Sequence, residues 1–110
     1  MTPLEELVEE LEADLQSWNQ LSLYEFSWFL RGLKRGLAED EIAEICQQAY
    51  DEISRRHSLH LEWFDWPDTG PDAGRTAEPG TPLDFDINTT GKIDSPFLAL
   101  VPDVPQAVST

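Results

Sequence analysis

Residues 57–66, HSLHLEWFDW, mark the point where the sequence changes from a helical to an alternating pattern. Leu59, Leu61 and Trp63 fall on one face of an extended chain with polar side chains between them, and this alternation is typical of a strand. Pro67 ends the pattern, because proline has no backbone N–H to donate to a sheet. The stretch therefore predicts a strand of about eight residues that separates a helical half of the chain from a sheet-forming half.

Hydrophobic residues at spacings of three and four predict three helices before this strand, at about residues 3–18, 22–35 and 39–56. Thr2 with Glu5, and Ser22 with Glu25, have the spacing of capping boxes, in which each side chain bonds to the backbone N–H of the other residue. Gly36 suits the left-handed residue that follows a helix C-terminus. The first half of the chain is therefore predicted to be helical, with a short turn before the third helix.

The segment after the strand combines a linker-like stretch with further alternation. Residues 67–82 contain four prolines and three glycines, a composition that predicts a flexible excursion. Alternation resumes over residues 83–87, and a turn at residues 88–91 leads to a second extended run that ends at Val101. We expect these two runs to form a hairpin that pairs with the first strand. Residues 102–110 show no periodicity and are expected to fray.

Residues 1–101 are thus predicted to form one α+β domain, with three N-terminal helices followed by a small antiparallel sheet of about three strands. The order of these elements across residues 21–101 resembles the winged-helix arrangement, in which residues 36–38 would form the turn and the strand would lead into a wing. Exposed positions of the third helix, such as Glu44 and Asp51, are acidic and argue against insertion into a DNA groove. The resemblance therefore concerns the fold and supplies no function.

Acidic residues outnumber basic ones by 22 to 7, which gives the chain a net charge of -15. Residues 1–30 carry seven acids and no base, residues 31–60 are almost balanced, and residues 61–110 carry nine acids and two bases. Nucleic-acid binding depends on Lys and Arg that neutralise phosphates, so this imbalance argues strongly against a DNA or RNA ligand. Two interpretations remain: the charge keeps a small protein soluble, or it forms an acidic face for a basic partner.

The first predicted helix is highly acidic, and its glutamates form like-charge pairs at i,i+4 without a Lys or Arg in the helix to offset them. The residues expected to face a partner are Glu5, Glu6, Glu9, Glu10 and Glu12. In the predicted strand, Trp63 shares a face with the core leucines, which leaves Phe64 and Trp66 as candidate anchors on the surface. The alternative is that the hairpin or the first helix covers them.

Two segments have a partial metal-binding pattern. Asp84, Asp86 and Asn88 have the spacing of the first three ligands of a calcium loop, but the later positions of the loop do not fit, so ion binding there stays open. His57 and His60 lack the closed four-ligand pattern of a zinc site. The chain also lacks a phosphate-binding glycine loop and a nucleophile motif. We therefore predict no enzymatic activity, no metal and no cofactor.

Our main hypothesis is a small acidic protein-binding module in the cytoplasm, specifically an inhibitor or immunity-type neutraliser of a basic protein that acts on nucleic acids. The cytoplasmic location rests on a single cysteine, Cys46, and on the lack of a leader or a long apolar run, which also argues against a membrane partner. The alternative is a winged-helix-like regulatory or scaffold domain that homodimerises through the first helix without binding DNA. The oligomeric state, monomer or homodimer, stays open.

Overall fold

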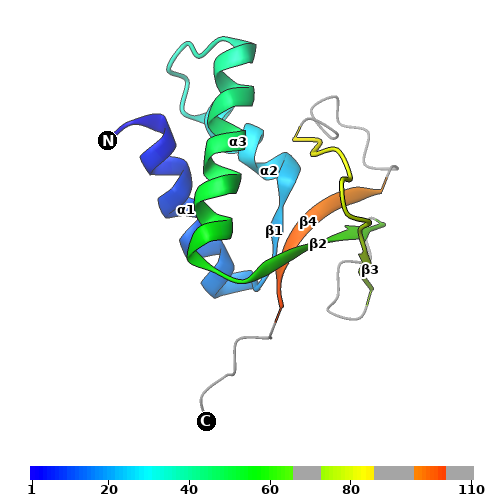
Figure 1. The fold of residues 1–110 in the computed structure, drawn as a ribbon. Helices are drawn as coiled ribbons and strands as arrows, with labels where there is room; N and C mark the ends of the chain where they lie inside the picture. Colours follow the sequence, from blue (N-terminus) through cyan, green and yellow to red (C-terminus); the bar gives the residue numbers. More distant parts are fainter. Residues whose placement is uncertain (66–72, 86–95, 104–110) are drawn as a thin grey trace.

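A computed structural model describes residues 1–65, 73–85 and 96–103, so the predictions for Trp66, Asp86, Asn88 and the tail from residue 104 lie outside the described residues. Within these ranges the elements follow in the order α1 (Pro3–Trp18), β1 (Leu21–Ser22), α2 (Leu23–Gly32), α3 (Glu39–Arg56), β2 (Leu59–Phe64), β3 (Arg75–Thr76) and β4 (Phe97–Pro102). The predicted α+β class, with N-terminal helices and an antiparallel sheet, is confirmed (Figure 1). Among the described residues, no helix has the length and apolarity needed to cross a membrane.

Helix α1 begins where the sequence predicted. The Thr2 backbone N–H donates to the Glu5 carboxylate at 2.9 Å, and the Glu5 backbone N–H donates to the Thr2 hydroxyl at 3.1 Å. This capping box satisfies backbone donors that a helix N-terminus would otherwise leave open. The helix buries Leu7, Leu11 and Leu15 against the core, which fixes the direction in which its acidic side chains point.

Helix α2 is shorter than expected, whereas α3 has the predicted bounds. Helix α2 ends at Gly32 rather than near Arg35, because Lys34 has a φ of 54°, a left-handed conformation that an α-helix does not continue. Ser22 makes no side-chain capping bond, so the second capping box is absent. In α3, the Ala38 backbone N–H donates to the Glu41 carboxylate at 3.1 Å and closes the start of the helix.

The sheet is antiparallel and has the strand order β1-β4-β2-β3. Strand β4 is central, since Leu100 pairs with Leu21 of β1 on one side and with Leu61 of β2 on the other. The sequence missed β1, which has two residues, and β3, which lies inside the stretch expected to be a flexible excursion.

The predicted hairpin needs a further correction. Residues 83–85 are not in a strand, and Phe85 instead packs against Phe26 and Tyr50 in the core. The Ser27 hydroxyl holds this segment by donating to the Phe85 carbonyl at 2.7 Å. Of the two predicted runs, the second contains β4, which pairs with β2, whereas the described part of the first, residues 83–85, forms no strand.

The connectivity of the larger elements bears on the winged-helix resemblance. Apart from the short β3, the chain runs α1-β1-α2-α3-β2-β4 with β4 between β1 and β2. The expected resemblance to a winged helix concerns this order of elements. It remains a resemblance of connectivity, which does not determine function.

Side chains cover the sheet on both faces. The helical layer packs on Leu98 and Leu100 of β4, while Phe64 and Phe97 stack at 5.9 Å on the opposite face together with Tyr24. Phe64 is 1% exposed. The prediction that Phe64 is a surface anchor is therefore wrong, because the alternation that removes it from the helical layer places it in a second small core.

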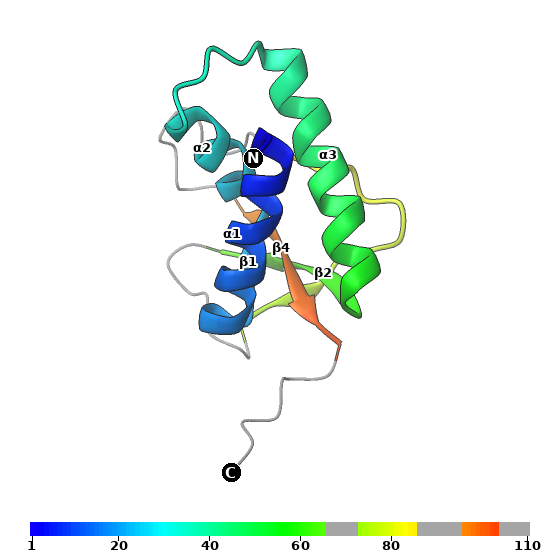
Figure 2. The same ribbon diagram turned by 90° about the vertical axis from the view of Figure 1, so that its left-hand side faces the viewer.

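The helices form one layer, and Figures 1 and 2 show α1 beside α3. Helix α1 packs more extensively against α3 than against α2. Its acidic residues consequently divide into two rows, one beside α3 and one beside α2. This division determines which of the predicted partner-binding residues lie together.

Candidate functional site

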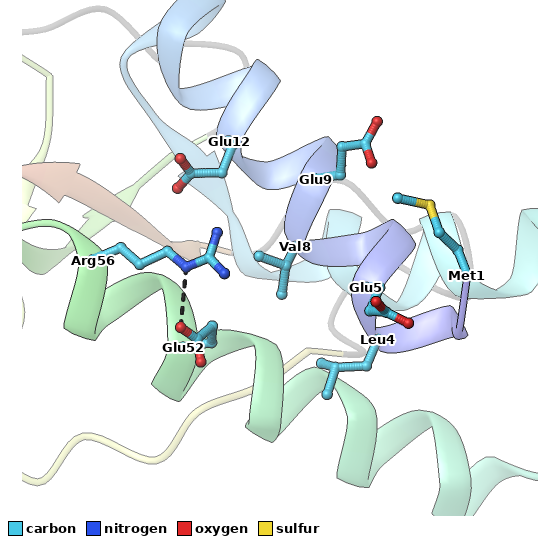
Figure 3. A pocket seen from close by; sticks show the side chains of 8 residues that line it. All are labelled: Met1, Leu4, Glu5, Val8, Glu9, Glu12, Glu52 and Arg56. Atoms are coloured by element: carbon cyan, nitrogen blue, oxygen red, sulfur yellow. Dashed lines mark hydrogen bonds and ion pairs between the residues drawn. The ribbon is translucent and has the colours of Figure 1, made fainter.

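A groove of about 460 Å³ lies between α1 and α3 (Figure 3). The residues that line it come from the first three turns of α1, from Met1 just before that helix, and from the last two turns of α3. They are Met1, Leu4, Glu5, Val8, Glu9, Glu12, Glu52 and Arg56. The side chains of four glutamates and one arginine together contribute a formal charge of -3 to this lining. The groove is therefore both acidic and partly apolar.

The floor of the groove is apolar. Leu4 and Val8 are one helical turn apart, so they lie on the same side of α1. Val8 is buried and Leu4 half-buried, whereas the side chain of Met1 is 73% exposed. An apolar side chain of another molecule could cover Leu4 and Met1 and remove this surface from water.

Glu5, Glu9 and Glu12 form the α1 rim of the groove, at spacings that place them on one side of the helix. The hydrogen bond from the Thr2 backbone lowers the pKa of Glu5, because it stabilises the charged form of the carboxylate. Glu12 contacts His57 just beyond α3, with 2.6 Å between its carboxylate and Nε2. Glu9 is exposed. The structure thus brings together three of the five glutamates predicted to face a partner.

The α3 rim carries a more balanced charge. Arg56 Nε donates to the Glu52 carboxylate at 3.0 Å, and Arg55 forms an ion pair with the other oxygen of the same carboxylate. Figure 3 shows the Arg56 guanidinium directed into the groove, on the side of Val8. One rim is therefore made of carboxylates, and the other of an ion pair.

Glu6 lies on the opposite side of α1 and has a structural partner. Arg35 forms a two-pronged ion pair with it, with Nη1 at 2.6 Å and Nη2 at 2.8 Å from the two carboxylate oxygens. The Glu6 side chain is 22% exposed. This contact joins α1 to the loop after α2, so the charge of α1 is compensated from another element, which spacing within the helix could not reveal.

Glu10 also lies on the α2 side, near Asp14 and Glu25. Burial and then the neighbouring carboxylates raise the pKa values of Glu10 and Glu25, and burial raises the pKa of Asp14. These shifts favour the protonated forms in the folded state. Glu6 and Glu10 are therefore separated from the groove, and the five predicted glutamates do not form one surface.

A second hollow, of about 310 Å³, lies at the loop between α2 and α3 and includes Arg31, Lys34 and Arg35. Two of these cations face carboxylates of the same chain. Arg31 donates to both oxygens of Glu39, at 3.0 and 2.9 Å, and Arg35 contacts Glu6. The basic residues at this end of α2 thus contribute to internal ion pairs.

The two histidines have carboxylate neighbours but line neither of these hollows. His60 lies between Asp103 and Glu62, at 2.7 and 2.6 Å from its two ring nitrogens. Burial lowers the pKa of His60, but the hydrogen bonds to Asp103 and Glu62 outweigh this effect and raise it overall. Within residues 1–65, 73–85 and 96–103, no group of three or more His, Cys, Asp or Glu side chains is arranged to hold a metal ion.

Two exposed aromatic residues were missed by sequence reasoning. Trp18 is 76% exposed and Trp28 is 44% exposed. The helical spacing places Trp18 on the buried stripe, but it is the last residue of α1 and lies one turn beyond Leu15, where the core ends. The exposure of Trp18 could have been predicted from its position, because an apolar residue at the very end of a helix has fewer neighbours to cover it.

The groove can bind a positively charged group beside an apolar one, since it offers carboxylates along one rim and aliphatic side chains on its floor. No protein-family model, curated protein or solved structure matches this chain.

Proposed function

We propose that the protein is a small acidic protein-binding module, and that the groove between α1 and α3 binds a basic segment of another protein. The observation that carries the proposal is the acidic rim of Glu5, Glu9 and Glu12 above the apolar floor of Leu4 and Val8. This combination matches a segment that has Lys or Arg next to an apolar side chain. The expected location of the complex is the cytoplasm.

Charge and apolar surface would have separate roles in this complex. The net charge of -15 attracts a basic protein from a distance, and the rim concentrates that attraction at the groove. Burial of apolar side chains on the floor then slows dissociation. Association should therefore depend on ionic strength more steeply than dissociation does.

The charge of the rim also supports a class of partner. Proteins that act on nucleic acids carry Lys and Arg surfaces that contact phosphates. A module with an acidic groove would compete with the nucleic acid for those surfaces. We therefore propose an inhibitor or immunity-type neutraliser of such a basic protein.

The groove is testable with a fluorescent peptide of about 14 residues, with Leu and Arg spaced so that each kind forms one face of a helix. The test variant replaces Glu5, Glu9 and Glu12 with glutamine. A glutamine in place of Glu5 can still accept the hydrogen bond from the Thr2 backbone in the capping box, so we expect the fold to be preserved. The control variant carries E44Q, D51N and E78Q, which remove three exposed charges away from the groove.

We expect the groove variant to bind the peptide roughly tenfold more weakly at low salt and the control variant to lose less than about threefold. Stopped-flow fluorescence measures both rates. Equal losses in the two variants would mean that bulk charge alone attracts the peptide, and would refute the groove. The inhibitor role is tested with a nuclease or other basic enzyme that binds the wild type and not the groove variant. The enzyme should lose activity in the presence of the wild type and keep it in the presence of the variant.

The second hypothesis, a winged-helix-like scaffold that homodimerises through α1, has support from the order of elements alone. Two copies meeting at α1 would bring two acidic rims together, which opposes association at low salt. Sedimentation velocity distinguishes the hypotheses. A stable dimer that persists at low ionic strength would favour the scaffold.

A further inference from the structure

Arg56 is the positively charged side chain in the groove lining that the structure describes. Arg56 lies in the last turn of α3, and its guanidinium points into the groove between the floor and Glu52 (Figure 3). Its side chain is 49% exposed, so it is held at the surface and not in the core. A cation of the protein itself therefore already lies where the proposed function places a cation of the partner.

The pairing of Arg56 with Glu52 is not required to neutralise that carboxylate. Arg55 pairs with the same side chain and does not line the groove. Both arginines are in the last turn of α3, where each favours the helix dipole by roughly 0.3–1 kcal/mol. The two residues thus share their structural roles and differ in their position relative to the groove.

We infer that Arg56 is a built-in occupant of the groove, and that the partner contributes an arginine that displaces it and takes its place beside Glu52. This inference rests on the proposed function, because it concerns the same groove. It adds the chemistry of the partner side chain and a residue that limits its binding.

The shape of the site favours arginine over lysine in the partner. A guanidinium is planar and carries several N–H donors in a fixed fork. An arginine of the partner can therefore replace the single bond from Arg56 Nε to Glu52, whose other oxygen Arg55 holds, and still donate to a carboxylate of the opposite rim. The aliphatic part of an arginine also packs along apolar surface such as Val8. A lysine offers a single compact charge and would use less of this site.

The experiment uses the full chain and the Leu/Arg peptide, with a version of the peptide that carries lysine in place of arginine. R56Q removes the internal occupant. R55Q is the matched control, since it removes the same positive charge from the same last turn of α3. We expect R56Q to bind the arginine peptide roughly threefold to tenfold more tightly than the wild type, and R55Q to differ by less than about twofold. The gain should be smaller for the lysine peptide.

The outcomes separate the two proposals. If the wild type binds the peptide and R56Q binds it no more tightly than R55Q, or more weakly, the role proposed for Arg56 is overturned. The proposal that the groove binds the peptide would then still hold. Absence of peptide binding by all three proteins would overturn both. If R56Q does not fold by circular dichroism, R56K replaces it. R56K keeps the charge and lacks the fork, so it should show a smaller gain, and no gain would again overturn the inference.

Discussion

The two sides of α1 carry similar charges but have different surroundings. On the side of α2, Glu6 is held by Arg35, and Glu10 and Asp14 lie near Glu25. On the side of α3, the three groove glutamates border a hollow with an apolar floor. One acidic helix thus faces residues of α2 and the loop after it along one row, and open surface along the other.

This contrast shows that the number of charges on a helix does not indicate their role. Glu6 and Glu9 are the same residue type and lie in adjacent turns of α1. The Glu6 side chain is 22% exposed and forms an ion pair, whereas Glu9 is exposed at the groove rim. What separates them is the element that α1 packs against on each side. The following changes test this contrast, beginning with the one that should affect both sides.

Leu11→Ala should have the largest effect, because it loosens α1 and so disturbs both rows together. Leu11 is 3% exposed in the main core. Removing a buried leucine side chain costs about 2–5 kcal/mol of the free energy of unfolding. Urea denaturation followed by circular dichroism measures it. Trp18→Ala, at the exposed end of the same helix, should cost less than about 0.5 kcal/mol, and an equal cost would contradict the placement of α1.

Arg35→Glu should affect the α2 side alone. The substitution replaces an ion pair with two neighbouring carboxylates, and the partial exposure of Arg35 and Glu6 limits the cost to about 1–2 kcal/mol. Lys34→Glu makes the same change of charge at an exposed neighbour and should cost clearly less. Thermal unfolding compares the two. The groove should still bind the Leu/Arg peptide in both variants, and loss of binding in R35E at a temperature where it is folded would show that the two sides are coupled.

Asp14→Asn should have the smallest effect and the opposite sign. Raised pKa values mean that the stability contributed by Glu10, Asp14 and Glu25 is complete below their ordinary values of 4.5, 3.8 and 4.5 and is lost as the pH rises through the higher folded values. Near pH 7 the three carboxylates repel, so the variant should be more stable by about 0.3–0.5 kcal/mol.

The gain from Asp14→Asn should shrink as the pH falls toward 4, which denaturation at several pH values measures. A gain that stays constant across this range would mean that the carboxylate charge of Asp14 is not its source. Glu44→Gln, on the exposed surface of α3, provides the control for a change of charge alone.

Local signals in the sequence were sufficient for much of the helical layer. The capping box of Thr2 and Glu5 and the bounds of α3 depend on residues within one or two turns of each other, so spacing alone predicts them. The end of α2 was missed because the left-handed conformation of Lys34, unlike that of Gly36, has no cue in residue type.

The sheet and the site depend on contacts between distant residues. Ser22 is the N-cap residue of α2, as predicted, but its side chain makes no capping bond. It also belongs to β1 and pairs with Ala99 of β4, and no local pattern reveals this partner. Phe64 was placed on the surface because alternation identifies two faces and does not say what covers the second one. Likewise, the five glutamates of α1 were predicted as one partner-facing set. The position of Glu5, Glu9 and Glu12 opposite Arg56, apart from the other two, comes from the packing of α1 on α3.

The central position of β4 has a consequence for biosynthesis. Of the strands in the described part of the chain, β4 is the last to be made, and it joins β1 to β2. Until residue 102 has left the ribosome, the sheet cannot close, and the apolar sides of Leu21 and Leu61 have no strand between them. Exposed apolar surface of this kind promotes aggregation of growing chains. The first thirty residues of each chain carry seven acids and no base. Repulsion between these charges would keep growing chains apart during this interval.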